Sequence, residues 1–215
     1  MKSLLKMIAG VLCVGVLCLV SVAHAEVLAP DALINTTVQD VLSIIKRDKD
    51  IQAGNQKKIL ELVDAKVLPH FDFARMTKLA VGKSWRTATP EQQKALVTEF
   101  RNMLVRTYTK AFTVYRDQTV EVKPFKMAAD AAEVTVKTSI NKPGAQPVPV
   151  DYEMEKTADG WKVFDVAIEG VSMVTSYRGT FTSQIEQNGI DGLIKTLADK
   201  NANAANQSLR KADAK

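Results

Sequence analysis

The residues that decide the fold run from Ala132 to Ile168 and read AEVTVKTSINKPGAQPVPVDYEMEKTADGWKVFDVAI. Apolar and polar residues alternate in successive segments of this stretch, and a period of two is typical of a strand with one buried face. The segments are separated by Asn141–Gly144 and Asp159–Gly160, which are turn sequences. The stretch therefore predicts an antiparallel meander.

The strand before this meander and its last strand complete the expected sheet. Val120–Val122 alternates in the same way, and Pro124 follows it, which favours an edge position because proline lacks a backbone donor. The sheet is therefore expected to have four strands. The last strand carries bulky side chains on both faces, and we expect it to lie centrally. These are Trp161 and Val163 on one face and Phe164, Val166 and Ile168 on the other.

Upstream of the strands, the apolar residues recur at helical spacing. Pro30–Arg47 predicts an amphipathic helix, and Asp72–Val81 predicts a shorter one that ends at Gly82. Thr89–Gln92 has the pattern of a capping box with proline at the first helical position. The helix that begins there is expected to run to about Tyr115, a length on the order of 39 Å. Its broad apolar face is long enough to back a whole sheet.

The chain returns to helix after the last strand. Ser172 is a candidate N-cap for a helix that ends near Gly189, and a short final helix is expected to end at Leu197. Residues 200–215 are poor in bulky side chains, so we expect a disordered tail. Helices, an antiparallel meander and further helices indicate an α+β fold with the sheet wrapped on the long helix and additional N- and C-terminal helices. The sheet–helix interface is either a filled core or a cavity.

The first 25 residues have the composition of a secretory signal. Lys2 and Lys6 make the start of the chain positive, and Met7–Val20 is an apolar run. Ala23-His24-Ala25 supplies small residues at the cleavage positions. The run is shorter than the roughly 20 residues that a membrane-spanning helix needs. We therefore expect a signal peptide over residues 1–25, cleaved after Ala25, followed by one domain over residues 26–199.

Cleavage would change the composition from which function is judged. The net charge falls from +5 to +3, because two lysines and no acids are lost. Both cysteines also go, and His70 is then the sole histidine. A chain without cysteines has neither thiol catalysis nor cysteine-based zinc sites. We expect no metal, no cofactor and no nucleic-acid partner. Asp165, on the last strand, is a candidate general base, but one acid without a placed partner is weak support for catalysis.

Several motifs stand in order along the chain. They are His70–Phe73, Gly82–Gln93, Phe100, Tyr108, Glu169–Met173 and Gly189–Leu193. Together they resemble the MlaC family, the periplasmic phospholipid-binding proteins of Gram-negative bacteria. The similarity covers nearly all of the chain after residue 25 and lapses only in the tail.

The resemblance implies a fold related to the nuclear-transport-factor-2-like cone. It also implies that a diacyl glycerophospholipid lies in an apolar pocket between sheet and helices, with its headgroup in water. From the residues alone, the apolar faces are more typical of a filled core, so the lipid-binding assignment rests on the resemblance. The expected lipid-binding residues are Phe100, Leu104, Tyr108, Val134, Val136, Val150, Tyr152, Met154 and Val163.

The resemblance also implies two partners in the periplasm. One is an inner-membrane MCE-domain protein of an ABC transporter, and the other is an outer-membrane lipoprotein with a porin. A carrier between them would maintain the lipid asymmetry of the outer membrane, and no enzymatic activity is expected. Glu169, Val171 and Thr175 are the expected partner-binding residues. The alternatives are a cone-shaped enzyme acting on an apolar small molecule and a periplasmic lipoprotein chaperone.

Overall fold

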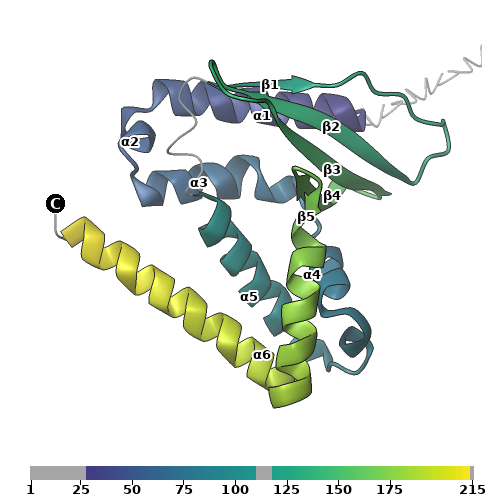
Figure 1. Cartoon of the computed structure of the whole chain (residues 1–215), viewed down its shortest axis with the longest axis vertical. Helices are drawn as coiled ribbons and strands as arrows, with labels where there is room; N and C mark the ends of the chain where they lie inside the picture. The colour runs from purple at the N-terminus through teal and green to yellow at the C-terminus, as the bar shows by residue number, and fades with distance from the viewer. Residues whose placement is uncertain (1–27, 110–117, 214–215) are drawn as a thin grey trace, which may run out of the picture.

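The structure, a computed structural model, describes residues 28–109 and 118–213 (Figure 1). The predicted signal peptide and the predicted end of the long helix, from residue 110 on, lie outside the described residues. The sheet is antiparallel with five strands in the order β1-β2-β3-β4-β5, one more than expected. The fifth has two residues, too few to show an alternating pattern. The strands are β1 (Thr119–Val122), β2 (Glu133–Asn141), β3 (Val148–Thr157), β4 (Gly160–Ile168) and β5 (Val171–Ser172).

A β-bulge in β4 overturns the expected facing of the last strand. Glu153 pairs with Asp165 and Met154 pairs with Val163, so Phe164 has no partner on β3. A bulge of one residue moves the side chains that follow it to the opposite face. Trp161, Val163, Val166 and Ile168 therefore share one face, and β4 is not a central strand covered by bulky groups on both sides. Among the described residues, the strand that follows β4 in the sheet order is the two-residue β5.

The helix packed on the apolar face of the sheet is α1 (Pro30–Arg47). Leu33 and Ile34 of α1 are buried in one cluster with the sheet residues, which we call the sheet cluster. Its other buried members are Val136, Val150, Met154, Trp161, Val163 and Val166. In Figure 1, α1 runs along the sheet. The expectation that the sheet wraps on the long helix is therefore corrected among the described residues.

The long helix α5 (Pro90–Tyr108) belongs to a second core, which we call the helical cluster. It packs against α4 (Phe73–Val81) and α6 (Met173–Asp213), with Phe100 buried between edge-to-face Tyr177 and Phe181. Both α1 and α5 are amphipathic, and periodicity does not say which partner an apolar stripe meets. The helix beginning at Pro90 was expected to back the sheet because its apolar face is wide and long.

Local sequence signals set the helix boundaries where they were predicted. Thr89 and Gln92 form the capping box of α5, with hydrogen bonds of 3.2 and 3.0 Å. The Asp72 carboxylate caps α4 by accepting from the backbone N–H of Arg75 at 2.8 Å. Gly82 follows α4 with φ of 66°, a backbone conformation that glycine adopts without a Cβ clash. The remaining short helices are α2 (Lys49–Gln52), α3 (Gln56–Lys66), η1 (Leu68–His70) and η2 (Gly82–Arg86).

The end of α6 differs from the disordered tail expected after residue 199. The helix bends at Gly189, where φ is 69° and ψ is 179°, and then continues to Asp213. Asn201 is buried, and its Nδ2 donates to the backbone oxygen of Glu99 at 2.9 Å and to the Glu99 carboxylate at 2.7 Å. Alanine-rich sequence extends a helix readily once it has begun. The segment is therefore helical although it has few bulky side chains.

Candidate functional site

The predicted lipid-binding residues fall into two groups. Val136, Val150, Met154 and Val163 are buried in the sheet cluster, and Val134 and Tyr152 are half-buried beside them. Cross-strand pairing of Val136 with Tyr152, and of Met154 with Val134 and Val163, brings this group onto one face. The other group lies in the helical cluster, where Phe100 and Leu104 are buried and Tyr108 is half-buried.

Two side chains join these groups. Phe71 and Met173 each pack against both the sheet cluster and the helical cluster. Phe71 is further tied to β4 by a bridge to Val163, and the backbone N–H of Asp72 donates to the Val163 oxygen at 2.8 Å. The predicted lipid-binding residues did not include Phe71 or Met173, although Phe71 lies in the motif His70–Phe73 and Met173 lies in the motif Glu169–Met173. The predicted apolar pocket would have to lie at this junction.

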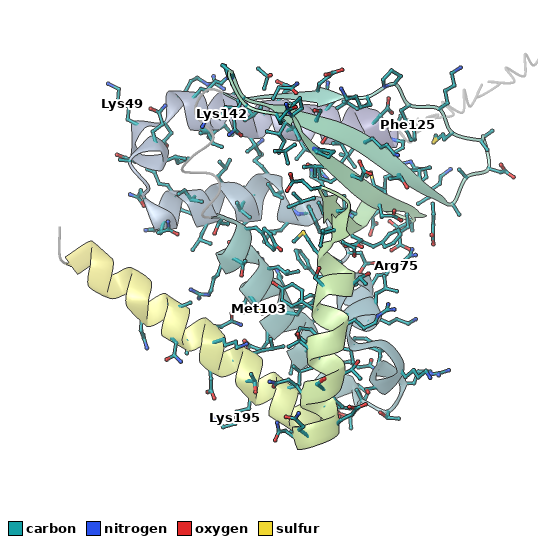
Figure 2. All side chains as sticks on the ribbon, viewed as in Figure 1. Lys49, Arg75, Met103, Phe125, Lys142 and Lys195 are labelled. Atoms are coloured by element: carbon teal, nitrogen blue, oxygen red, sulfur yellow. The ribbon has the colours of Figure 1, made fainter. Side chains whose placement is uncertain are left out.

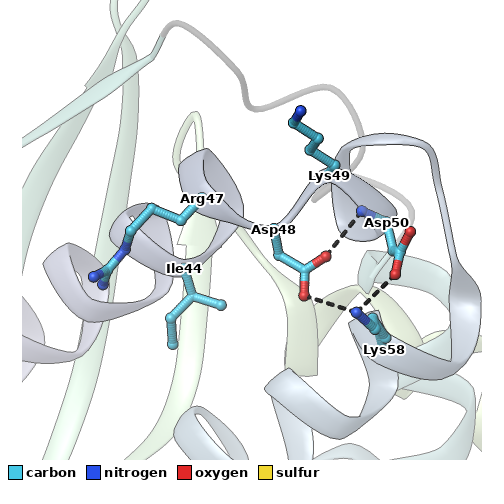
Figure 3. Close-up of a pocket in the computed structure, with 6 residues that line it drawn as sticks. All are labelled: Ile44, Arg47, Asp48, Lys49, Asp50 and Lys58. Atoms are coloured by element: carbon cyan, nitrogen blue, oxygen red, sulfur yellow. Dashed lines mark hydrogen bonds and ion pairs between the residues drawn. The ribbon is translucent and has the colours of Figure 1, made fainter.

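Two surface hollows lie on the part of the chain that the structure describes, and neither is lined by Phe71 or Met173. One, of about 370 Å³, lies between residues 124–131 and β2 and is lined by Phe125, Met127 and Val134 among others. Val134 is the predicted lipid-binding residue that reaches this hollow. The other, of about 430 Å³, is polar and lies where α1, α2 and α3 meet (Figure 3). There Lys58 bridges Asp48 and Asp50 at 3.2 and 2.7 Å, and these charged groups suit no acyl chain.

Arg75 connects the helical half to the sheet, and the sequence analysis missed it. Figure 2 shows this side chain between α4 and the strands. Its guanidinium bonds Glu155 at 2.5 Å and Glu133 at 2.6 Å and lies 3.6 Å from the ring centroid of Phe164. Burial acts to lower the pKa of Arg75, but the bonds to Glu133 and Glu155 outweigh it and raise the pKa. One α4 residue therefore holds three strands.

Asp165 serves the start of α6. Its Oδ1 accepts from the backbone N–H groups of Val166 at 2.8 Å and Val174 at 3.1 Å, and its Oδ2 accepts from the Ser172 hydroxyl. Both carboxylate oxygens are thus used in capping a helix. This geometry gives the carboxylate a structural role and offers no support for the general-base alternative.

The predicted partner-binding residues form an exposed corner between β4 and α6, defined by Glu169, Val171 and Thr175. Glu169 has φ of 51° and its N–H donates to the Pro149 oxygen at 2.9 Å. Val171 is 62% exposed although it pairs with Ile168, and Thr175 is exposed. The backbone holds an apolar side chain in water at this corner.

His70 lies at the edge of the sheet, half-buried in η1. Burial lowers the pKa of its imidazole, and the nearby Lys162 lowers it further. The Lys162 ammonium donates to the Pro69 oxygen at 2.6 Å and is thereby held next to η1. The neutral imidazole is the form that this site favours.

Within residues 28–109 and 118–213, none of the helices has the length and apolar content that crossing a membrane would require.

Known proteins resemble this chain over most of its length. It is 27% identical over 169 residues to the toluene tolerance protein ttg2D of Pseudomonas putida, and this alignment covers 78% of each chain. It is 25% identical over 158 residues to the intermembrane phospholipid transport system binding protein MlaC of Haemophilus influenzae, covering 69% of this chain and 73% of that one.

A solved structure matches the fold closely. It is a phospholipid-binding protein from Ralstonia solanacearum in complex with a phospholipid, 42% identical, with a TM-score of 0.76. The match covers 81% of this chain and 98% of that chain. Residues 35–199 match the family described as MlaC protein, so the chain belongs to the MlaC family.

Proposed function

We propose that the protein is a periplasmic phospholipid carrier, with a diacyl glycerophospholipid as ligand. The observation that carries this proposal is the Ralstonia structure, which holds a phospholipid and matches most of the described chain. The two apolar clusters on either side of Phe71 and Met173 supply the surface that acyl chains require. We propose no enzymatic turnover, because Asp165 is engaged in capping α6.

The energetics of lipid transfer explain why such a carrier needs a deep apolar site. Each buried CH₂ contributes roughly 0.8 kcal/mol, so two chains of about 15 methylenes resist desorption into water by about 24 kcal/mol. A protein that carries a lipid through water must cover both chains. The nine predicted lipid-binding residues belong to the two apolar clusters from which we propose that this cover is built.

Native mass spectrometry of the purified protein tests the ligand. We expect a bound diacyl phospholipid, and an empty protein with no extractable lipid would contradict the proposal. Val150→Trp places a bulky ring in the sheet cluster and should lower lipid occupancy while the circular dichroism spectrum is unchanged. Lys142→Trp, at an exposed position in the turn between β2 and β3, is the matched control and should leave occupancy unchanged. Equal occupancy in both variants would place the ligand elsewhere.

The proposed carrier works after removal of residues 1–25. It would exchange lipid with an outer-membrane lipoprotein–porin complex and with the MCE-domain protein of an inner-membrane ABC transporter. The amino-terminal sequence of the exported protein tests the cleavage, and we expect it to begin at Glu26. An intact Met1 on the exported protein would argue against the signal.

We propose that the corner of Glu169, Val171 and Thr175 contacts one of these partners. An exposed valine on a backbone fixed by strand pairing presents apolar area with little entropy to lose on binding. Glu169→Lys should change capture of the purified MCE domain in a pull-down. Unchanged capture would count against this corner.

A further inference from the structure

Four exposed basic side chains gather at the end of α4 and on the two elements beside it. Lys78 lies in the last turn of α4, Lys83 and Arg86 lie in η2, and Arg178 lies in the first half of α6. We call these four residues the basic face. Both α4 and η2 contact α6, as Figure 1 shows for α4.

The packing brings the elements that carry these side chains together. The Arg178 Nε donates to the backbone oxygen of Leu79 at 3.0 Å, which sets Arg178 next to Lys78. Lys83 and Arg86 are three residues apart in a 3₁₀ helix, so they project from the same side. The basic face is therefore built on three packed elements and does not depend on a loop.

The basic face is not neutralised by the protein itself. Among residues 28–109 and 118–213, the ion pairs involve other cations, and none includes Lys78, Lys83, Arg86 or Arg178. Arg75, one turn before Lys78 on the same helix, is held by two carboxylates. The unpaired charges thus attract an external anionic surface.

The basic face continues from the exposed corner. Thr175 and Arg178 are three residues apart on α6, a spacing that puts them on one side of a helix. Val171, 62% exposed, precedes Thr175. Together these residues offer the apolar Val171, two residues from the exposed Glu169, at one end and a set of cations at the other. The Asp165 cap holds the junction.

We propose that this continuous surface docks an acidic face of a partner protein, with Val171 entering a small apolar recess beside its carboxylates. The inference rests on the proposed function, because it gives the chemistry of the partner that a lipid carrier meets. A protein is favoured over a membrane because this surface holds a single exposed large apolar side chain, Val171, which can fill a recess in a protein but offers little to insert among lipids. The exposed large apolar residues of the described chain are Leu28, Met127 and Val171.

Charge reversal with a matched control tests the inference. Lys83→Glu/Arg86→Glu and the control Lys142→Glu/Lys156→Glu change the net charge equally, and all four side chains are exposed. Dissociation constants are measured for the mature protein against the purified MCE domain and against the purified outer-membrane lipoprotein complex. The first variant should bind at least one of them about 10-fold more weakly at low salt, and the control should bind as wild type does.

Other outcomes separate this inference from the proposed function. If both double variants weaken binding equally, or neither does, the surface is not specific and the inference fails alone. If the first variant loses binding only to vesicles of phosphatidylethanolamine and phosphatidylglycerol, the surface meets a membrane and the inference is overturned. A wild-type protein that binds neither partner overturns both the partners and the surface. Lipid content by native mass spectrometry should be unchanged in every variant. A loss of lipid in Lys83→Glu/Arg86→Glu would point to misfolding, and the neutral variant Lys83→Gln/Arg86→Gln then takes its place in the binding test.

Discussion

Replacing Arg75 with methionine should lower the free energy of unfolding, because this side chain connects α4 to the sheet. Methionine keeps the aliphatic stem but removes both ion pairs and the contact with Phe164. Arg75 and Glu155 are 25% and 21% exposed, whereas Glu133 is 57% exposed. The two carboxylates therefore contribute unequally.

The expected loss follows from these exposures. The bond to the largely buried Glu155 is of the charged kind and contributes roughly 2 kcal/mol. The exposed pair with Glu133 contributes about 0.5 kcal/mol, since solvent screens it. The guanidinium over the Phe164 ring adds about 1 kcal/mol. We expect Arg75→Met to lower the free energy of unfolding by about 3 to 4 kcal/mol.

Urea unfolding followed by circular dichroism measures this loss. The control Arg101→Met removes an exposed pair with Asp64 and should cost about 0.5 kcal/mol. In a double-mutant cycle, Arg75→Met with Glu155→Gln should lose less than the sum of the single changes, with a coupling of about 2 kcal/mol. A loss below about 1 kcal/mol for Arg75→Met, or a coupling near zero, would refute the reasoning.

Three further predictions concern single sites. Because burial and then Lys162 lower the pKa of His70, the unfolded chain binds the extra proton first, so stability is full above about pH 6.5 and falls as the pH drops below it. His70→Gln should therefore lose less stability than wild type in urea unfolding between pH 7.5 and 5.5, and parallel losses would contradict this. Gly189→Ala forces a φ of 69° and ψ of 179° on an L-residue and should cost about 1 to 3 kcal/mol by thermal unfolding, with Gly179→Ala as the helical control. Asp165→Ala removes the cap of α6 and should cost about 2 kcal/mol while lipid occupancy persists; lost occupancy in a folded variant would assign Asp165 to the ligand.

Elements defined by local chemistry were predictable from the sequence. Helix α1 begins at Pro30 and ends at Arg47, as its apolar period indicated. The capping box at Thr89 and the N-cap at Asp72 involve residues within one helical turn, so their signals are complete in a short window. The alternating segments likewise gave four of the strands.

Elements defined by contacts between distant residues were not predictable in this way. The bulge at Phe164 depends on the register against β3, and an alternating count along one strand does not reveal an extra residue. Arg75 meets Glu133 and Glu155, which lie 58 and 80 positions away in the chain. Its sequence context shows only an arginine on a short amphipathic helix. The same limit applied to the helix that packs on the sheet, because α1 and α5 both carry an apolar stripe.

The packing around Phe71 and Met173 constrains how the proposed ligand is held. Val136, Met154 and Val163 are fully buried against neighbouring side chains, so acyl chains reach this position only by displacing contacts within the clusters. A domain of this kind is stable by only about 5 to 15 kcal/mol, whereas burial of two acyl chains is worth about 24 kcal/mol. Burial of the proposed ligand can therefore outweigh the core contacts that it displaces.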